Sequence, residues 1–328
     1  MDFGFIRVAA AIPSVKVADC TYNIAHIEPL IRQAAQQGAA VVALPELSIT
    51  GYTCADLFNQ PFLLQQAEIA LETLLQKTAD LPTLCIVGMP VAFHNQLYNT
   101  AVVFCQGHIL GVVPKSYLPN YNEFYEARWF ASGAELSDKQ QITLCGQQTP
   151  FTPRLLFHDG EVCLGIEICE DLWVPIPPSS RLALAGANLL VNISASDEMV
   201  GKHSYLCSLI EQQSARTISA YLYCSAGCGE SSTDLVFAGN GLIVENGTIL
   251  QTNDRFSFDE QITICDVDIE KMMAQRRQTS TFHNAEPTPE YCHVEVKIPR
   301  LDYTSTPLMR KFEPYPFVPR EDAHINER

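Results

Sequence analysis

The sequence is short of positive charge and has no long hydrophobic run. Its 328 residues include 21 Lys and Arg against 37 Asp and Glu, which gives a formal net charge of −16 at pH 7. Proteins that bind nucleic acids need a basic face for phosphate contacts, so this balance argues against a nucleic-acid partner. No apolar stretch reaches the roughly 18 residues that a membrane span requires, so we expect no membrane partner either.

Sequence motifs for nucleotides and metals are also missing. The chain contains no GxxxxGK[ST] loop, no Gly-rich dinucleotide fingerprint and no HExxH pair. The eight histidines are scattered, and the C-x3-C pair of Cys224 and Cys228 has no second pair or histidine cluster near it. We therefore predict no metal site, and no cofactor for the reaction considered below.

Cysteine, in contrast, is abundant. The twelve cysteines are irregularly spaced, and many lie within apolar segments, which suits a reducing compartment better than a disulfide framework. The first residues, 1–8, lack the basic flank and long apolar region of a secretory signal and are typical of a first strand. These features predict a cytoplasmic protein.

Three short apolar segments end at a chemically reactive side chain. One runs into Glu46, a second into Lys115 and a third into Cys169. Taken singly, such a Glu or Lys is most often solvated and such a Cys is a small core residue. Residues just past the carboxyl ends of neighbouring strands, however, meet in one crevice. The combination predicts an active site in which Cys169 is the nucleophile, presented at a sharp strand end beside a backbone N–H.

Five stretches around these residues resemble one known family. The chain resembles the nitrilase superfamily, with its Glu-Lys-Cys triad, and more narrowly the amidase (glutaminase) domain of glutamine-dependent NAD synthetases. The matching stretches span most of the first 245 residues in the order of the family: LPELSITGYTCADLF (44–58), PKSYLPNYNEFYEARWF (114–130), GIEICEDLW (165–173), NISASDEMVGK (192–202) and GESSTDLVFAGN (229–240).

The chemistry assigns a role to each member of the triad. Amide hydrolysis through a thioester needs a thiolate near neutral pH, and Lys115 is expected to lower the pKa of Cys169 from its usual value of about 8.5. Glu46 takes the thiol proton, passes it to the departing ammonia and then activates water. Lys115 and the backbone N–H after Cys169 stabilise the tetrahedral oxyanion, where one donor contributes on the order of 3 kcal/mol.

A buried lysine beside a thiol needs a further anion, and Glu123 and Glu126 are both candidates. In the related family the supporting carboxylate lies two residues before an arginine and four before an aromatic residue. Arg128 and Phe130 match that pattern for Glu126. The resemblance therefore favours Glu126, although a register error of one turn would favour Glu123.

The resemblance also implies a binding site for L-glutamine. The residues that match positions around the bound substrate are Tyr121, Glu170, Trp173, Ser196 and Lys202. Free glutamine is a zwitterion, so its site needs an acceptor for the ammonium and a donor or cation for the carboxylate. Glu170 could supply the first, and Ser196 with Lys202 the second. From the residues alone, Lys202 is better explained as a solvated residue in the first turn of a helix.

Alternating strand-like and helix-like patterns predict an α/β fold with antiparallel pairs. The resemblance implies more, namely a nitrilase-like four-layer α-β-β-α sandwich with mixed sheets. Strands are expected at 6–12, 40–44, 84–93, 97–105, 108–113, 155–156, 162–168, 189–193, 221–225, 241–245 and 262–267, and helices at 22–37, 57–77 and 202–218.

The character of the sequence changes after about residue 270. We expect residues 1–270 to form the glutaminase domain, and residues 271–328, which are polar with scattered prolines, to form an extended C-terminal arm or linker. The resemblance implies that this arm leads to a synthetase domain that uses ATP and Mg to make NAD from nicotinic acid adenine dinucleotide. No SGGxDS-type loop occurs in the chain, so that domain is expected to lie outside it.

Two other functions remain open at this stage. A stand-alone nitrilase-type hydrolase of another small amide would have the same triad, and only its substrate profile would differ. A non-catalytic scaffold that assembles with a synthetase is the other alternative, although intact Glu46, Lys115 and Cys169 argue against it. Members of the family associate, so the resemblance also implies a homo-oligomer.

Overall fold

Two β-sheets form the centre of the protein. The computed structural model describes residues 1–233, 235–285 and 289–312. In the first sheet β1, β2 and β3 are parallel to one another, and the remaining pairs are antiparallel. Its six strands, in spatial order, are β14 (Gln261–Asp268), β1 (Phe5–Ile12), β2 (Val41–Ala43), β3 (Leu84–Phe93), β4 (Gln96–Cys105) and β5 (His108–Pro114).

The second sheet is also mixed, with β9, β10 and β11 parallel. Its seven strands, in spatial order, are β13 (Thr248–Thr252), β12 (Gly241–Glu245), β11 (Ala220–Ser225), β10 (Leu189–Ser194), β9 (Val162–Ile168), β8 (Leu155–Asp159) and β15 (Cys292–Glu295). A separate hairpin joins β6 (Gln141–Leu144) to β7 (Gln147–Pro150).

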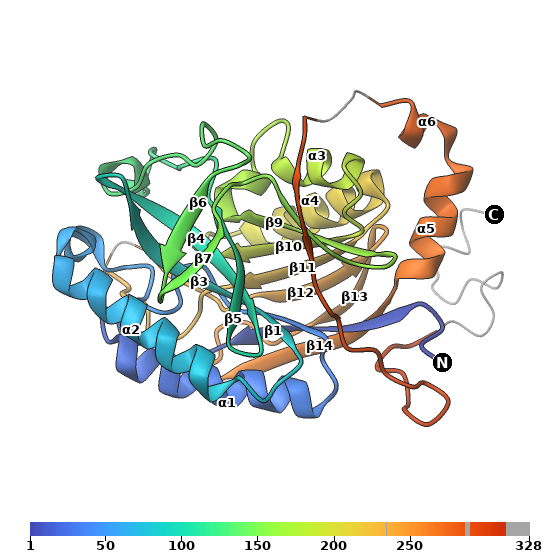
Figure 1. Cartoon of the computed structure of the whole chain (residues 1–328), viewed down its shortest axis with the longest axis horizontal. Helices are drawn as coiled ribbons and strands as arrows, with labels where there is room; N and C mark the ends of the chain where they lie inside the picture. Colours follow the sequence, from blue (N-terminus) through green and yellow to red (C-terminus); the bar gives the residue numbers. More distant parts are fainter. Residues whose placement is uncertain (234, 286–288, 313–328) are drawn as a thin grey trace.

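Side-chain alternation explains why the sheets stack in layers. In β1, Ala9 and Ala11 face the helices α1 (Cys20–Gln36) and α2 (Pro61–Lys77), whereas Val8 and Ala10 face the other sheet. Both faces of the strand are therefore buried, which its sequence allows because every residue except Arg7 is apolar. The helices α3 (Pro178–Leu184) and α4 (Lys202–Thr217) cover the outer face of the second sheet. The predicted four-layer α-β-β-α sandwich is confirmed (Figure 1).

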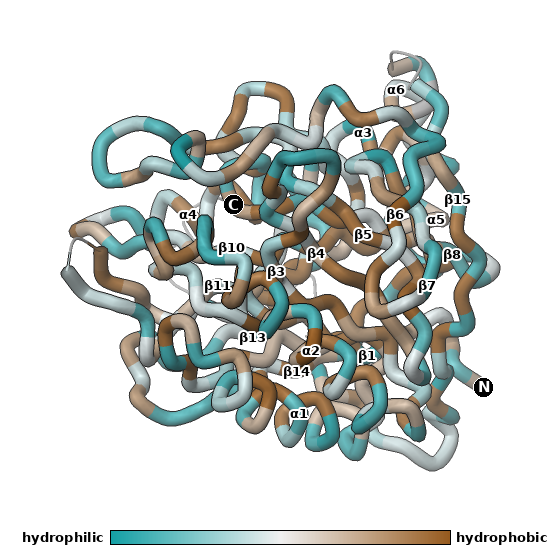
Figure 2. The backbone as a smooth tube through the Cα atoms, turned by 60° about the vertical axis from the view of Figure 1, so that its left-hand side comes forward, coloured by the Kyte–Doolittle hydropathy of each residue, from teal (hydrophilic) through white to brown (hydrophobic). Residues whose placement is uncertain are grey.

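Hydropathy follows the same layers. Figure 2 shows hydrophobic colour along the central strands and hydrophilic colour on the outer loops. Among the described residues, no helix combines the length and the apolar character needed to cross a bilayer.

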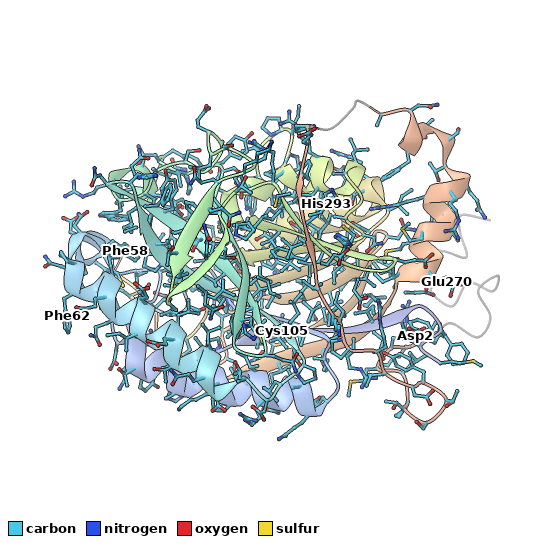
Figure 3. The ribbon with its side chains drawn as sticks, in the orientation of Figure 1. Asp2, Phe58, Phe62, Cys105, Glu270 and His293 are labelled. Carbon is cyan, nitrogen blue, oxygen red and sulfur yellow. The ribbon has the colours of Figure 1, made fainter. Side chains whose placement is uncertain are left out.

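The segment before α2 differs from its predicted form. The sequence pattern predicts one helix from residue 57, but a short 3-10 helix, η1 (Ala55–Asn59), comes first and α2 begins only at Pro61. Proline is favoured at the first position of a helix because its missing N–H has no helical partner there. The break turns Phe58 into the core while Phe62 projects from α2 into solvent, as Figure 3 shows.

Several short elements were not predicted, because each is too short or too polar to give a clear pattern. They are β6, β7, α3, β13, α5 (Ile269–Gln278), α6 (Ser280–His283) and β15. The expected domain boundary at residue 270 falls inside α5, whose Met272 is buried in the core between the sheets. Farther along the arm, β15 adds to the second sheet by pairing parallel to β8. Residues 313–328 of the arm lie outside the described residues.

The C-terminal arm forms hydrogen bonds with a buried ion pair of the first sheet. Arg7 of β1 donates to both carboxylate oxygens of Asp266 on β14, at 2.8 and 2.9 Å. The same carboxylate accepts the phenol of Tyr303 at 2.6 Å, and Arg7 also donates to the backbone oxygen of Pro307 at 2.9 Å. The arm therefore contributes hydrogen bonds to a group that the first sheet buries, and we propose that residues 298–312 fold as part of this domain.

This arrangement predicts a large loss of stability in Arg7→Met. The change leaves Asp266 buried at 0% exposure without its cation, and breaking such a pair costs about 3–5 kcal/mol. Urea denaturation would measure the loss. Arg32→Met is the matched control, because Arg32 pairs with Asp80 and Glu28 at the surface and such pairs contribute less than about 1 kcal/mol. Equal losses in the two variants would contradict this role of the pair.

Candidate active site

The thiol of Cys169 lies on a strained turn. β9 ends at Ile168, and Cys169 opens the 3-10 helix η3 (Cys169–Leu172) with a φ of 44°. A positive φ costs a residue with a Cβ roughly 1–2 kcal/mol, so the surrounding structure has to hold it. Asn192 of β10 does so by accepting the Cys169 N–H at 3.1 Å. Cys169 is 5% exposed, and the hydrogen bond from its backbone N–H to Asn192 holds it in this position.

Glu46 lies three residues beyond the last residue of β2, at the same rim of the sandwich. One carboxylate oxygen accepts hydrogen bonds from Lys115 Nζ at 2.7 Å and from Asn99 Nδ2 at 2.6 Å. The other accepts a hydrogen bond from the backbone N–H of Ala195 at 2.8 Å. The side chain is fully buried. Three donors fix the carboxylate, and the bond from Ala195, which follows β10, ties it to the second sheet.

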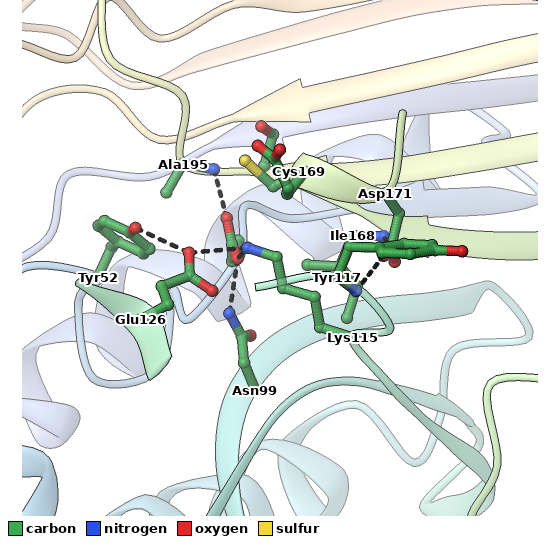
Figure 4. Close-up of polar contacts among 12 residues, drawn as sticks. Tyr52, Asn99, Lys115, Tyr117, Glu126, Ile168, Cys169, Asp171 and Ala195 are labelled. Carbon is green, nitrogen blue, oxygen red and sulfur yellow. Dashed lines mark hydrogen bonds and ion pairs between the residues drawn. The ribbon is translucent and has the colours of Figure 1, made fainter. Parts of the chain in front are cut away.

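The ammonium of Lys115 lies between two carboxylates. It donates to Glu46 and to Glu126, at 2.7 Å in both cases, and Tyr52 donates its phenolic proton to the same Glu126 oxygen at 2.8 Å. Figure 4 shows the ammonium of Lys115 beside Glu126, with the sulfur of Cys169 on the side of Ala195.

The two candidate supporting carboxylates have different surroundings. Glu126 opens the 3-10 helix η2 (Glu126–Arg128) and is 1% exposed. Glu123 is partly exposed and makes no ion pair with Lys115. It lines a cavity of about 260 Å³ beside Tyr52, with Phe124, Trp129 and Leu235 among the other walls. The structure therefore pairs Lys115 with Glu126 and not with Glu123.

Electrostatics at the thiol differ from the expected pattern. Burial raises the pKa of Cys169, Glu46 raises it further, and Lys115 opposes them. The contribution of Lys115 has the predicted sign, but the predicted net lowering of the pKa is wrong for this structure, because burial and a nearby carboxylate outweigh one cation. The thiol is therefore protonated near neutral pH, and a base has to remove its proton when it attacks.

The two supporting groups influence each other. Burial alone would lower the pKa of Lys115, but the charges of Glu126 and Glu46 raise it well above its usual value. Burial raises the pKa of Glu126 to about 7, against the opposing effect of Lys115. Lys115 is thus a permanent cation, whereas Glu126 titrates near neutral pH.

Two contacts join residues predicted to surround the substrate to one another. Tyr121 donates its phenolic proton to Glu170 at 2.8 Å, which joins the loop after β5 to the nucleophile turn. The Nζ atom of Lys202 lies 5.3 Å from the ring centre of Trp173 and forms a close ion pair with Asp197. Ser196, 4% exposed, is adjacent to Asp197, and its backbone N–H donates to Ser225 Oγ at 3.2 Å.

Several residues of the cluster were not singled out from the sequence. They are Tyr52, Asn99, Asp171, Asn192, Ala195 and Asp197. All except Asn99 fall inside the stretches that carry the family resemblance, but nothing in their spacing reveals a role. Asn99 gave one usable signal, since it is a polar residue in an apolar strand. No group of three or more His, Cys, Asp or Glu side chains in the described part of the chain could hold a metal ion.

Comparison with known proteins adds three findings. The sequence model of carbon-nitrogen hydrolases matches residues 7–277. A glutamine-dependent NAD(+) synthetase of Mycobacterium leprae is 37% identical over 344 aligned residues, which cover 100% of this chain and 50% of that protein. The corresponding Mycobacterium bovis protein is 38% identical, with 99% and 48% covered. The chain thus spans about half the length of the curated relatives it matches.

Solved structures agree with this comparison. The glutamine-dependent NAD(+) synthetase of Cytophaga hutchinsonii superposes with a TM-score of 0.72 at 27% identity, covering 80% of this chain and 43% of that one. An amidase from Nesterenkonia shares the fold, with a TM-score of 0.62 at 19% identity over 84% of this chain and 95% of its own.

Proposed function

We propose that this chain, which belongs to the carbon-nitrogen hydrolase family, hydrolyses the side-chain amide of L-glutamine through a thioester on Cys169. The observation that carries the proposal is the Lys115 ammonium held between the buried carboxylates of Glu46 and Glu126, at the rim where Cys169 ends its strand. A buried cation between two carboxylates, next to a thiol, is costly to maintain and is typical of a catalytic site.

The first half-reaction forms the thioester. Glu46 takes the proton of Cys169 as the sulfur bonds to the amide carbon, because the raised thiol pKa leaves that proton in place until attack. The carbonyl oxygen becomes negative and is stabilised by Lys115 and by the backbone N–H that follows Cys169. The C–N bond then breaks, and Glu46 gives the same proton to the departing ammonia.

The second half-reaction releases glutamate and restores the site. Glu46, again a carboxylate, draws a proton from water as the water oxygen attacks the thioester carbon. The C–S bond breaks, and the proton returns to the sulfur of Cys169. The three hydrogen bonds on Glu46 support both steps, because they hold the carboxylate in one orientation.

Glutamine as the substrate is supported by the relatives and by the charges near the thiol. Glu170 follows Cys169 and can accept the α-ammonium of the substrate, and Lys202 with Ser196 can bind its α-carboxylate. Asp197 already balances the charge of Lys202, so the substrate carboxylate would have to displace Asp197 or share the lysine with it. Tyr121 and Trp173 would provide the apolar walls between these charged ends.

The wider role rests on the relatives, which are about twice as long as this chain. We propose that the ammonia serves NAD synthesis from nicotinic acid adenine dinucleotide in a synthetase domain, and that ATP and Mg are needed only there. All twelve cysteines are free thiols, which supports a reducing compartment such as the cytoplasm. A homo-oligomer is proposed on the family resemblance alone.

Ammonia release from a panel of amides tests the substrate. We expect the chain to release ammonia from L-glutamine at least about 100-fold faster than from L-asparagine or aliphatic amides, because a site that pairs charged ends rejects ligands that lack or misplace them. The measurement is a coupled ammonia assay at fixed enzyme concentration. Equal turnover of simple amides would instead indicate a general nitrilase-type amidase, and turnover of none of them a non-catalytic scaffold.

A pair of glutamate variants tests the supporting carboxylate. We expect Glu126→Gln to lower kcat about 100-fold, because Lys115 loses one of its two anions and its position shifts. The kcat of this variant should also lose any pH step near 7, since the group with the raised pKa is gone. Glu123→Gln is the matched control and should remain within about 3-fold of the parent protein. A larger loss of kcat in Glu123→Gln than in Glu126→Gln would make Glu123 the supporting carboxylate.

A further inference from the structure

The nucleophile and the lysine belong to different sheets. Cys169 follows β9 of the seven-stranded sheet, whereas Lys115 follows β5 at the edge of the six-stranded sheet. The ammonium of Lys115 donates to Glu46 and Glu126, and neither bond reaches the turn that carries Cys169. A separate contact is needed to set the distance between the lysine and the thiol.

One buried carboxylate spans this gap. An oxygen of Asp171 accepts the backbone N–H of Ile168 at 3.0 Å, immediately before the nucleophile. The other oxygen accepts the backbone N–H groups of Ser116 at 3.2 Å and Tyr117 at 2.8 Å, immediately after Lys115. Figure 4 shows Asp171 beside Ile168 and Tyr117. Asp171 is 2% exposed, so water does not compete strongly for these three bonds.

Glu46 has its own link across the sheets. Its side chain accepts the N–H of Ala195, and its backbone N–H donates to Ser194 O at 3.3 Å at the end of β10. The base is therefore placed relative to the second sheet without Asp171. Among the described contacts, two side-chain bridges join the segment after Lys115 to the nucleophile turn. The hydrogen bond from Tyr121 to Glu170 is exposed, whereas Asp171 is buried and binds the backbone next to both Lys115 and Cys169.

We propose that Asp171 is a positioning residue that sets the distance between Lys115 and Cys169 by joining the backbone on either side of them. The inference rests on the proposed thioester chemistry. Asp171 does not touch the substrate. It holds the cation where the oxyanion forms, and a displacement of about 1 Å there can lower the rate about 100-fold.

The test is Asp171→Asn. The asparagine amide has the same shape as the aspartate side chain and keeps one acceptor oxygen. Its NH2 group replaces the other oxygen and cannot accept a hydrogen bond, so the backbone N–H groups on that side lose their acceptor. We expect kcat for glutamine to fall about 100-fold while KM changes less than about 3-fold, because the lost alignment affects the transition state and not substrate binding.

The matched control is Asn188→Ala. Asn188 accepts the Cys163 N–H at 3.0 Å and donates to Glu161 O at 2.6 Å, near the start of β9 and away from the nucleophile turn. It makes the same kind of buried side-chain bridge, so its loss should lower the melting temperature and leave kcat within about 3-fold. A kcat loss as large in Asn188→Ala as in Asp171→Asn would overturn the proposal, since both would then report general destabilisation.

A second readout does not depend on glutamine. The rate at which iodoacetamide alkylates Cys169, followed by mass spectrometry of its peptide, reports how well Glu46 and Lys115 assist loss of the thiol proton. We expect about a 10-fold slower rate in Asp171→Asn and no change in Asn188→Ala. If the parent chain hydrolyses no glutamine, glutamine is excluded as its substrate, but the alkylation rate still tests whether Asp171 positions Lys115 relative to Cys169. An unchanged rate, or an unchanged kcat in an active parent, overturns the proposal.

The variant Asp171→Glu covers the case in which Asp171→Asn does not fold. It keeps a carboxylate on a longer stem, so it can still accept N–H groups but shifts the bridge by one methylene. We expect a smaller kcat loss, about 10-fold, with KM unchanged. Parent-level kcat and alkylation rate in this variant would overturn the proposal.

Discussion

Replacing Cys169 with alanine is expected to lower kcat by about 10⁵-fold, to the background of the assay. Removal of a nucleophile eliminates the covalent route entirely, and the remaining donors give only a small residual rate. The expected fall in stability is small, because the side chain is short and alanine also tolerates the turn. Ammonia release from glutamine measures the first effect, and thermal unfolding measures the second.

Cys224→Ala is the matched control for this prediction. Cys224 is a fully buried thiol in β11 that donates only to the backbone oxygen of Ala11 at 3.4 Å. Its loss should leave kcat within about 3-fold of the parent protein while lowering stability by about 1 kcal/mol. Mass spectrometry of the parent protein incubated with a glutamine analogue that carries a reactive group should find the adduct on Cys169. An active Cys169→Ala variant would exclude the thioester mechanism.

Replacing Lys115 with methionine is expected to reduce both activity and stability. Methionine has nearly the same length and volume, so the change removes the charge and little of the packing. The oxyanion loses its cationic donor, which should lower kcat at least about 10³-fold. Glu46 and Glu126 remain buried without a cation, and the free energy of unfolding should fall by about 3–5 kcal/mol near neutral pH.

The stability loss in Lys115→Met should depend on pH in a defined direction. Burial already raises the pKa of Glu126 to about 7 in the presence of Lys115, and removing that cation raises it further. A carboxyl group with a raised folded pKa binds its proton more tightly in the folded state, so it costs stability as pH rises above its unfolded pKa of about 4.3. The variant should therefore lie closer to the parent in stability at pH 5 than at pH 8.

Urea denaturation of both proteins at the two pH values measures this difference. Lys77→Met, a change of an exposed lysine at the end of α2, is the control and should cost less than about 0.5 kcal/mol at either pH. A loss in Lys115→Met that is equal at pH 5 and pH 8 would mean that the two carboxylates do not depend on the cation.

The proposed triad could be picked out from the sequence because Glu46, Lys115 and Cys169 each follow an apolar strand. Glu46 and Cys169 follow parallel strands, and such ends meet at one rim whatever the details of packing. The preference for Glu126 over Glu123 needed the family pattern, since both are loop glutamates in the sequence. Their different burial depends on how the loop after β5 folds back against Tyr52.

Other features of the site had no signal in the sequence. The ion pair between Lys202 and Asp197 joins residues five apart across the start of α4, where spacing does not separate a pair from two solvated charges. The thiol pKa moved opposite to the expectation because it depends on burial and on the separations among three charged groups. The polar arm was expected to extend from the domain, yet its residues 303–307 complete the hydrogen bonds of Asp266, a partner that the sequence does not identify.

By itself, the sequence determined most of the central strands and showed that Glu46, Lys115 and Cys169 each follow the end of one of them. These follow from local patterns, since apolar periodicity and strand ends are set by neighbouring residues. Only the tertiary structure decided how Asp171 joins the two sheets, that Lys202 pairs with Asp197 and in which direction the thiol pKa shifts. Those properties depend on distances and burial among residues far apart in the chain, and packing alone sets them.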